Sequence, residues 1–507
     1  MVRDRHIVFV GSTPDARRFA GTAAETIDLG GRLLLPGFID DHVHFVLGGE
    51  AVSGLDTRTC ASKAEFIAAL HTFVDRHRGA WVKGGDWDHE HWAEKILPRK
   101  EWVDPFSQDT PLFLPRFDWH MALANSAALA AAGITRATPD QVGGKIERDP
   151  ATGEPTGIVK DAAMDLVLAC IPKPTAADLE RRVRDALVVA RKNGVTSIHD
   201  IAEPSHIPVY RALADAGELT CRIFARLPLS GHRAIAEQRI THHAGDAFLR
   251  LGSMKAFSDG SLGSTTAWFF ERYLNEDTCG LPMEVLSDGR MRAWALEADR
   301  NGLQLSIHAI GDRANSAVLD IFEEVVRTNP AWDRRFRIEH AQHLRPEDIA
   351  RFAALGVIAS VQPYHAIDDG VWAASRIGAD RVKMTYAFRS MLDAGVHVCF
   401  GSDWTVSPLH PLGGIYAAVT RRTLDGKNPD GWVPEQKVSV EQAVRCTTIN
   451  NAYASFEEGI KGSITPGKLG DMVVLGEDIF AIPPERIRDV PVQMTVVGGH
   501  IVHREGL

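Results

Sequence analysis

The chain has 507 residues, of which 45% are hydrophobic and 24% are charged, a balance typical of a soluble globular protein. Its 66 acidic residues outnumber the 56 basic ones and give a net charge of −10, which argues against nucleic acid or an anionic membrane as a partner. The apolar segments fall short of the ~20 residues that a membrane-spanning helix needs.

The six cysteines are scattered along the chain and form no CxxC pair, which indicates a reducing compartment. The N-terminal apolar run is too short for the core of a signal peptide. We therefore expect a cytoplasmic protein and, at this length, an enzyme.

Both ends of the chain carry short β-like runs. Residues 1–35 contain "HIVFVGS", and residues 463–507 contain "DMVVLG" and "PVQMTVVGGHIVHREG". We expect the two termini to pair into a small, sandwich-like β-domain beside a main domain at residues 36–462.

Residues 60–175 form a long insertion after the first strand of the main domain, "GFIDDHVHF". The insertion is expected to begin with a helix whose Ser62 and Glu65 have the spacing of a capping box, and it holds much of the tryptophan. Two interpretations remain open, a cover that shapes a substrate pocket or an ordinary packed subdomain.

The rest of the main domain repeats a pattern of amphipathic helix, glycine and short apolar strand. The spacing predicts a helix over 176–192 with Thr175 as its N-cap. Gly194, Gly302, Gly356 and Gly395 occupy the position just past a helix, where the left-handed backbone favours glycine.

Helices that alternate with buried strands indicate a parallel sheet. The eight candidate strands are "GFIDDHVHF", "VTSIHD", "CRIFARL", "LGSMKAF", "LQLSIHA", "FRIEHA", "VIASVQP" and "HVCFGSD". Eight strands predict an α/β protein built on a (β/α)8 TIM-type barrel, with its active site at the carboxyl ends of the strands. An open doubly wound sheet is the alternative, although no GxGxxG motif supports it.

Several of these strands end in residues that can bind a metal. His42 and His44 are two apart, so in a strand both imidazoles lie on one face. His308, His340 and Asp403 end later strands, and together these ligands suit a borderline-soft divalent metal such as zinc. The HxH pair alone is a weak signal, because two structural histidines are commoner.

Lys255 lies within the apolar strand "LGSMKAF", where an unpaired ammonium is costly to bury. A plain ammonium paired with Asp259 or another acid is one explanation, and a site with a single metal ion goes with it.

Taken in order, "PGFIDDHVH", Lys255, His308, His340 and Asp403 resemble the metal-dependent amidohydrolase superfamily. Longer strings resemble its N-substituted formamide deformylase-like branch: "GGDWDHE", "DWHMALANSAAL", "MKAFSDGSLGSTTA", "SIHAIGDRA", "RIEHAQH" and "FGSDWTV". The terminal "GSITPGKLGDMVVL" is similar to the stretch that returns that family's chain to its small β-domain. The resemblance spans nearly the whole chain.

The resemblance implies two zinc ions per chain. His42 and His44 would hold the more buried ion, and His308 and His340 the more exposed one. Lys255 would be carboxylated on its amine and would bridge the ions as an anionic carbamate.

The resemblance also implies a catalytic role for Asp403. Two cations lower the pKa of a shared water enough to supply hydroxide near neutral pH. Asp403 would bind the buried ion, accept a proton from that hydroxide and pass it to the leaving amine, as a general base that becomes a general acid.

Further polar and aromatic residues are candidates for substrate binding, with a packing or capping role as the alternative for each. His343 is also an alternative ligand to His340, which we prefer because it directly ends its strand. The candidates are Trp87, Asp88, His120, Asn125, Arg313, His343, Gln362 and His365.

We therefore expect a metal-dependent amidohydrolase that cleaves an amide-type C–N bond in a small-molecule N-substituted amide or formamide. The same site could instead act on a carbamate, an ester or lactone, or a cyclic amidine. A catalytically silent metal-binding protein is the non-enzyme alternative. A homo-oligomer is compatible with all of these.

Overall fold

A computed structural model describes residues 1–20 and 25–506. Its centre is a parallel eight-stranded sheet with the strands in chain order from one edge to the other. The strands are β4 (Phe38–Val43), β10 (Val195–Ile201), β11 (Arg222–Pro228), β12 (Leu249–Phe257), β13 (Gln304–Ala309), β14 (Arg337–His340), β15 (Ile358–Val361) and β16 (Val398–Phe400).

The two edge strands of this sheet curl round to meet each other. Val43 forms a parallel bridge with Trp404, and Asp403 N donates to His42 O at 2.7 Å. The expected eight-stranded barrel is therefore confirmed, and the alternative open sheet is excluded.

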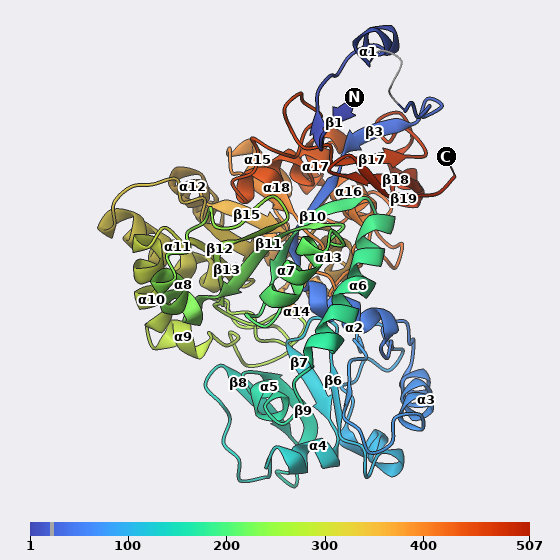
Figure 1. The fold of residues 1–507 in the computed structure, drawn as a ribbon. Coiled ribbons are helices and arrows are strands. Elements are labelled where there is room, and N and C mark those ends of the chain that lie inside the picture. Colours follow the sequence, from blue (N-terminus) through green and yellow to red (C-terminus); the bar gives the residue numbers. More distant parts are fainter. Residues whose placement is uncertain (21–24, 507) are drawn as a thin grey trace.

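Helices surround the barrel (Figure 1). The expected helix at 176–192 is present, and Thr175 and Asp178 cap each other's backbone N–H at its start. The described α-helices of this part are α2 (Phe45–Ser53), α6 (Ala176–Lys192), α7 (Ile207–Asp215), α8 (His232–Glu237), α9 (Glu284–Ser287), α10 (Arg290–Arg300), α11 (Asp312–Thr328), α12 (Pro346–Leu355), α13 (Pro363–Asp369), α14 (Ala373–Ile377), α15 (Phe388–Asp393), α16 (Pro411–Thr420), α17 (Val440–Cys446) and α18 (Ile449–Ala454).

The insertion between β4 and β10 builds a five-stranded sheet of its own, in the order β5-β6-β7-β9-β8. Its elements are α3 (Lys63–Val74), β5 (Val82–Lys83), β6 (Leu112–Pro115), β7 (Met121–Ala124), α4 (Ser126–Ala131), β8 (Gly144–Arg148), β9 (Pro155–Asp161) and α5 (Met164–Leu168). Ser261, in the loop after β12, donates to Asp118 of the insertion at 2.6 Å. The insertion therefore packs on the carboxyl ends of the barrel strands.

The two ends of the chain form a second small sheet, on the opposite side of the barrel from the insertion (Figure 1). It is antiparallel, in the order β19-β18-β17-β3, and a hairpin of β1 and β2 lies beside it through a bridge between His6 and Leu469. The elements are β1 (Val2–Arg3), β2 (His6–Ile7), α1 (Thr13–Ala20), β3 (Leu33–Pro36), β17 (Met472–Leu475), β18 (Val492–Val497) and β19 (His500–Arg504).

A buried ion pair joins the terminal sheet to the barrel. Arg222 at the start of β11 donates to both carboxylate oxygens of Asp471, at 2.6 and 2.9 Å. Gly498 N also donates to this carboxylate, at 2.7 Å. Removing one partner of such a pair leaves the other charge buried and uncompensated.

We therefore expect Asp471→Ala to lower the free energy of unfolding by about 3–5 kcal/mol, measured as a shift of the urea midpoint. Asp393→Ala removes the carboxylate of an exposed pair with Arg389 and should leave the midpoint nearly unchanged. Equal midpoints for the two variants would show that the buried pair does not hold the terminal sheet to the barrel.

Candidate metal centre

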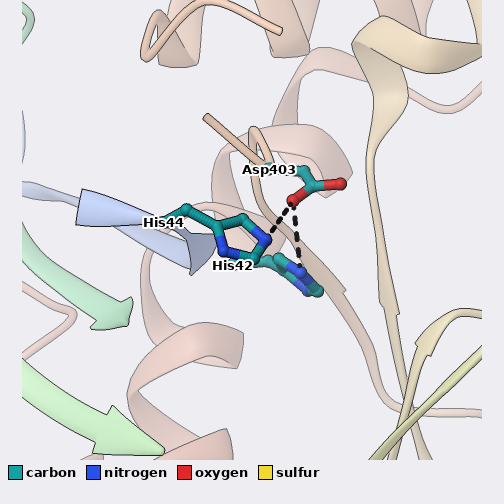
Figure 2. Close-up of side chains that lie close together, drawn as sticks. All are labelled: His42, His44 and Asp403. Atoms are coloured by element: carbon teal, nitrogen blue, oxygen red, sulfur yellow. Dashed lines mark ion pairs between the residues drawn. The ribbon is translucent and has the colours of Figure 1, made fainter. Parts of the chain in front are cut away.

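His42, His44 and Asp403 converge where the barrel closes (Figure 2). His42 lies in β4, His44 directly follows this strand, and Asp403 follows β16. Asp403 Oδ1 is 3.3 Å from Nε2 of each histidine. His42 Nε2 and Asp403 Oδ1 are buried without a hydrogen-bond partner among the described residues. Buried polar atoms are normally satisfied, so these two fit a bound cation.

His308 at the end of β13 and His340 at the end of β14 lie beside this group. The His340 ring centroid is 5.0 Å from that of His42 and 4.5 Å from that of His308. His340 Nδ1 donates to Gln362 Oε1 at 2.8 Å, which leaves its Nε2 as the lone-pair donor. His308 Nδ1 is buried without a hydrogen-bond partner in residues 1–20 and 25–506. Both rings therefore keep one nitrogen free to bind a metal.

Two residues of this group have left-handed backbone, His340 at φ 74° and Asp403 at φ 57°. Such conformations are uncommon for residues other than glycine and cluster at functional sites. At His340 the turn occurs where β14 ends, so the imidazole departs from the alternation of the strand.

Lys255 is buried, and its Nζ has no hydrogen-bond partner in the described part of the chain. The nitrogen lies 4.4 Å from the centroid of the Phe257 ring. Burial lowers the pKa of Lys255 to about 7, which favours a neutral amine.

Asp259 is not the partner of Lys255. The Asp259 carboxylate accepts hydrogen bonds from backbone N–H groups of Trp268, Ile310 and Gly311, at 2.8, 3.0 and 2.8 Å. It therefore holds the loop after β12 against the start of α11. The alternative of a Lys255–Asp259 ion pair is wrong.

Burial also keeps His42, His308 and His340 neutral. It lowers the pKa of His42 to about 4 and the pKa values of His308 and His340 well below the usual range. Burial raises the pKa of Asp403, but its interactions with His42, a hydrogen bond from His44 and its interaction with His340 outweigh burial and hold this pKa well below the usual range. Neutral imidazoles and an ionised carboxylate are the forms that bind metal.

Glu339 is a site residue that was not predicted from the sequence. It lies inside the barrel and sets the orientation of the His42 ring. Glu339 accepts from His42 Nδ1, which leaves Nε2 directed at Asp403. Two buried arginines balance its charge, Arg226 at 2.7 Å and Arg337 at 2.9 Å. A signal for this interior group is present in the sequence. Charged residues occupy alternate positions in "FRIEHA" and "CRIFARL", and residues at alternate positions of barrel strands point into the barrel together.

We expect Glu339→Gln to weaken zinc binding by about 10- to 100-fold, the usual cost of losing a residue that orients a ligand. Competition with a chelator measures the affinity, and excess zinc should restore any activity that is lost. Glu347→Gln, the same change at an exposed position of α12, is the control. Unchanged zinc affinity would show that Glu339 only balances Arg226 and Arg337.

A polar pocket adjoins Asp403 and His340 and has residues of the insertion in its wall, including His120. His120 Nδ1 lies 2.7 Å from Asp161 Oδ1, and its ring centroid is 5.3 Å from that of His308. His365 also lines this pocket, and its Nε2 is buried without a hydrogen-bond partner in the described chain.

Arg116 is a second residue that sequence reasoning missed. It lines the same pocket from the insertion and is fully buried. Asp118 lies 2.6 Å and Asp88 3.0 Å from its guanidinium. Asp88 is therefore a partner of the Arg116 guanidinium, and Arg116, not Asp88, lines the pocket. This contact joins residues distant in sequence, and no local pattern indicates it.

Two residues predicted to bind substrate lie inside the insertion instead. Trp87 is fully buried, and its indole N–H donates to Leu114 O at 2.7 Å. Asn125 caps α4 by accepting from Ala128 N, and it also accepts from Leu112 N. Both side chains complete the insertion core and do not reach the pocket.

Arg313 and His343 also lie away from the candidate ligands. The Arg313 guanidinium lies 4.4 Å from the centroid of the Trp268 ring. His343 Nδ1 lies 2.8 Å from Thr385 Oγ1. His340, rather than His343, is therefore the histidine of this segment that faces His42 and His308.

Comparison with known proteins places this geometry in a family. Residues 25–503 match the sequence profile described as the Amidohydrolase family. The chain belongs to the amidohydrolase family. Its fold and its strand-end histidines agree with a hydrolase of the metal-dependent amidohydrolase superfamily.

Three proteins show the extent of the similarity. The chain is 36% identical to LONG AFTER FAR-RED 3 of Arabidopsis thaliana, over 98% of this chain and 87% of that protein. It is 30% identical to N-substituted formamide deformylase of Arthrobacter pascens, over 98% of this amidohydrolase and 93% of the relative. The crystal structure of an uncharacterized metal-dependent hydrolase from Pyrococcus horikoshii OT3 superposes with a TM-score of 0.77 at 25% identity, covering 95% of this chain and 94% of that one.

No helix among the described residues has both the length and the apolar character needed to cross a membrane.

Proposed function

We propose that this amidohydrolase cleaves the C–N bond of a small N-substituted amide or formamide, using two zinc ions per chain. One observation carries the proposal. Four buried polar atoms at or beside the candidate ligands have no hydrogen-bond partner among the described residues, namely His42 Nε2, Lys255 Nζ, His308 Nδ1 and Asp403 Oδ1. Similarity to N-substituted formamide deformylase supports the choice of bond. The six cysteines are free thiols, which suits the cytoplasm.

His42, His44 and Asp403 would hold one ion, and His308 and His340 the other. When bound, such a pair polarises the scissile carbonyl and lowers the pKa of a bound water.

Lys255 completes this set only when it is anionic, because an ammonium would repel both cations. Burial lowers the pKa of its amine to about 7, so the neutral form is well populated at neutral pH. The neutral nitrogen adds to the carbon of CO₂, forming an N–C bond and releasing one proton. The resulting carbamate would bridge the two ions through its oxygens.

Asp403 moves the proton of the reaction. It lines the pocket beside the ligands and is ionised, so its carboxylate can accept the proton of the attacking water. It then returns this proton to the leaving nitrogen as the C–N bond breaks. His120 and His365 line the same pocket and would orient the substrate.

Parallel assays of the zinc-loaded enzyme test the proposal. Matched formamides, amides, carbamates, esters, lactones and cyclic amidines should be compared by kcat/KM. We expect amides or formamides to exceed the other classes at least tenfold. A preference for an ester or lactone, or no turnover of any amide by enzyme of full metal content, would contradict the proposal.

A further inference from the structure

A cluster of buried charges joins the insertion to α13, the helix that follows β15. His91 lies in the insertion, between β5 and β6, and its ring lies between two carboxylates. His91 Nδ1 is 3.3 Å from Asp88 Oδ2 of the same segment, and His91 Nε2 is 3.4 Å from Asp368 Oδ1 of α13. Both carboxylates are buried. His91 therefore connects the insertion to the barrel.

The two carboxylate oxygens that face His91 are not satisfied elsewhere. Asp88 uses its Oδ1 for Arg116, at 3.0 Å, and Asp368 uses its Oδ2 for Arg58, at 3.1 Å. Asp88 Oδ2 and Asp368 Oδ1 have no hydrogen-bond partner in the part of the chain that the structure describes. Because buried carboxylate oxygens are costly to leave unpaired, a positive charge is expected at His91.

The charge balance of the cluster indicates which form of His91 is present. Arg116 also pairs with Asp118, at 2.6 Å, so three carboxylates share two guanidiniums and one positive charge is missing. A neutral imidazole carries one N–H, whereas an imidazolium carries two. Only the imidazolium can donate to Asp88 and Asp368 together, and its charge completes the balance.

The surroundings of His91 favour this charged form. Its interaction with Asp368 raises its pKa, and the charge of Asp88 adds to the rise, while burial and a nearby guanidinium oppose it; the pKa is raised above the ordinary value. The side chain is 32% exposed, so solvent protons reach it. The charged and titratable groups around His91 are Asp88, His89 and Glu90 of its own segment, Arg58 after α2, Arg116 and Asp118 between β6 and β7, His365, Asp368 and Asp369 of α13, and Arg376 of α14, which pairs with Glu90.

The link lies beside the polar pocket of the candidate metal centre, whose wall includes Arg116 and Asp368. The pocket has about 40 Å³ of open space, far below the ~300 Å³ of the smallest typical ligand pockets, so a substrate enters only when the walls separate. The β12 side is tightly packed: Ser261 donates to Asp118 at 2.6 Å, and a Cβ at Gly263 would lie 2.2 Å from Arg116 Nη1. On the α13 side the ion pairs join side-chain ends, which can part without unfolding.

We propose that the His91 imidazolium is a latch that holds the insertion against α13 beside the pocket, and that its deprotonation loosens this contact and opens a route to the pocket. The latch is complete in acid solution and is lost as the pH rises above that at which His91 gives up its second proton. It is a property of the insertion and does not depend on which bond the enzyme cleaves.

Nuclear magnetic resonance tests the charge of His91. In enzyme labelled with nitrogen-15 histidine, its signal is the one missing from His91→Gln. We expect both ring nitrogens to be protonated at about pH 6, with an apparent pKa above the ~6.5 of an unperturbed histidine and a lower pKa in Asp368→Asn. A wild-type pKa at or below this ordinary value, or coordination of added zinc by one ring nitrogen, would overturn the proposal.

Hydrogen exchange tests the closure without any ligand, because amides exchange when a segment opens locally. At about pH 6 we expect residues 86–95 to exchange several-fold faster in His91→Gln than in the wild type. At about pH 9, where wild-type His91 is neutral, the rates should be equal. His71→Gln makes the same change at an exposed position of α3 and should match the wild type at both pH values. Equal exchange at pH 6, or a difference that persists at pH 9, would overturn the proposal.

Entry of a small probe tests the consequence for the pocket. Acetohydroxamate is a zinc ligand whose association with zinc-loaded enzyme can be followed by stopped-flow mixing. At about pH 6 it should associate several-fold faster with His91→Gln than with the wild type or His71→Gln, and the three rates should converge at about pH 9. Equal association at pH 6 would overturn the proposed route. Absence of probe binding by all three proteins would contradict the proposed zinc site instead.

Discussion

Asp403→Asn is expected to abolish most turnover while the protein keeps its fold. Asparagine preserves the shape of the side chain but cannot take a proton from water, and loss of a general base costs about 10²- to 10⁴-fold in kcat. The carboxamide oxygen can still face His42 and His44, whose Nε2 atoms lie 3.3 Å from Asp403 Oδ1. We therefore expect the loss mainly in kcat, with KM changed little.

Two measurements separate this role from simple metal loss. Zinc content and kcat should be determined on the same preparation, and Asp393→Asn supplies the same chemical change at an exposed position. Retained metal with unchanged turnover would show that Asp403 is not the base. Loss of metal in parallel with activity would reduce its role to that of a ligand.

Lys255→Ala is expected to lower both zinc content and kcat, the latter by on the order of a thousandfold, because several kcal/mol of transition-state stabilisation are lost. The alanine leaves space where a bridging anion belongs. Short carboxylates such as acetate or propionate should therefore restore part of the activity. Lys255→Met, which keeps the length and apolar stem without an amine, should lose activity and resist this rescue because its side chain fills the space.

Two outcomes would contradict a carbamate on Lys255. Full activity and full zinc content in Lys255→Met would show that the nitrogen carries no ligand. Equal rescue of the alanine and methionine variants by acetate would indicate an effect away from Lys255.

Much of the barrel is predictable because its signals are local. A glycine that follows a helix, like a run of apolar residues, reflects the conformation of residues close to it in sequence. The helix capped by Thr175, for example, ends at the residue that the spacing predicts. The candidate ligands follow from the fold, since parallel strands bring residues such as His42, His308 and His340 to one rim.

The supporting residues are harder to predict because their partners are distant in sequence. Arg116 looks like an ordinary polar residue in the sequence, and its buried partner Asp88 is 28 residues away. Trp87 and Asn125 look like pocket residues because of their type, yet the insertion has enough core to bury both. Their roles depend on packing across the insertion, which a one-dimensional pattern does not contain.

The proposed binuclear site is tested most directly by one crystallographic measurement on zinc-loaded enzyme, with anomalous data collected at the zinc edge. We predict two anomalous peaks per chain, one among His42, His44 and Asp403 and one beside His308 and His340. We also predict continuous density that extends the Lys255 amine into a carbamate between them. A single peak with a bare Lys255 amine would contradict the account.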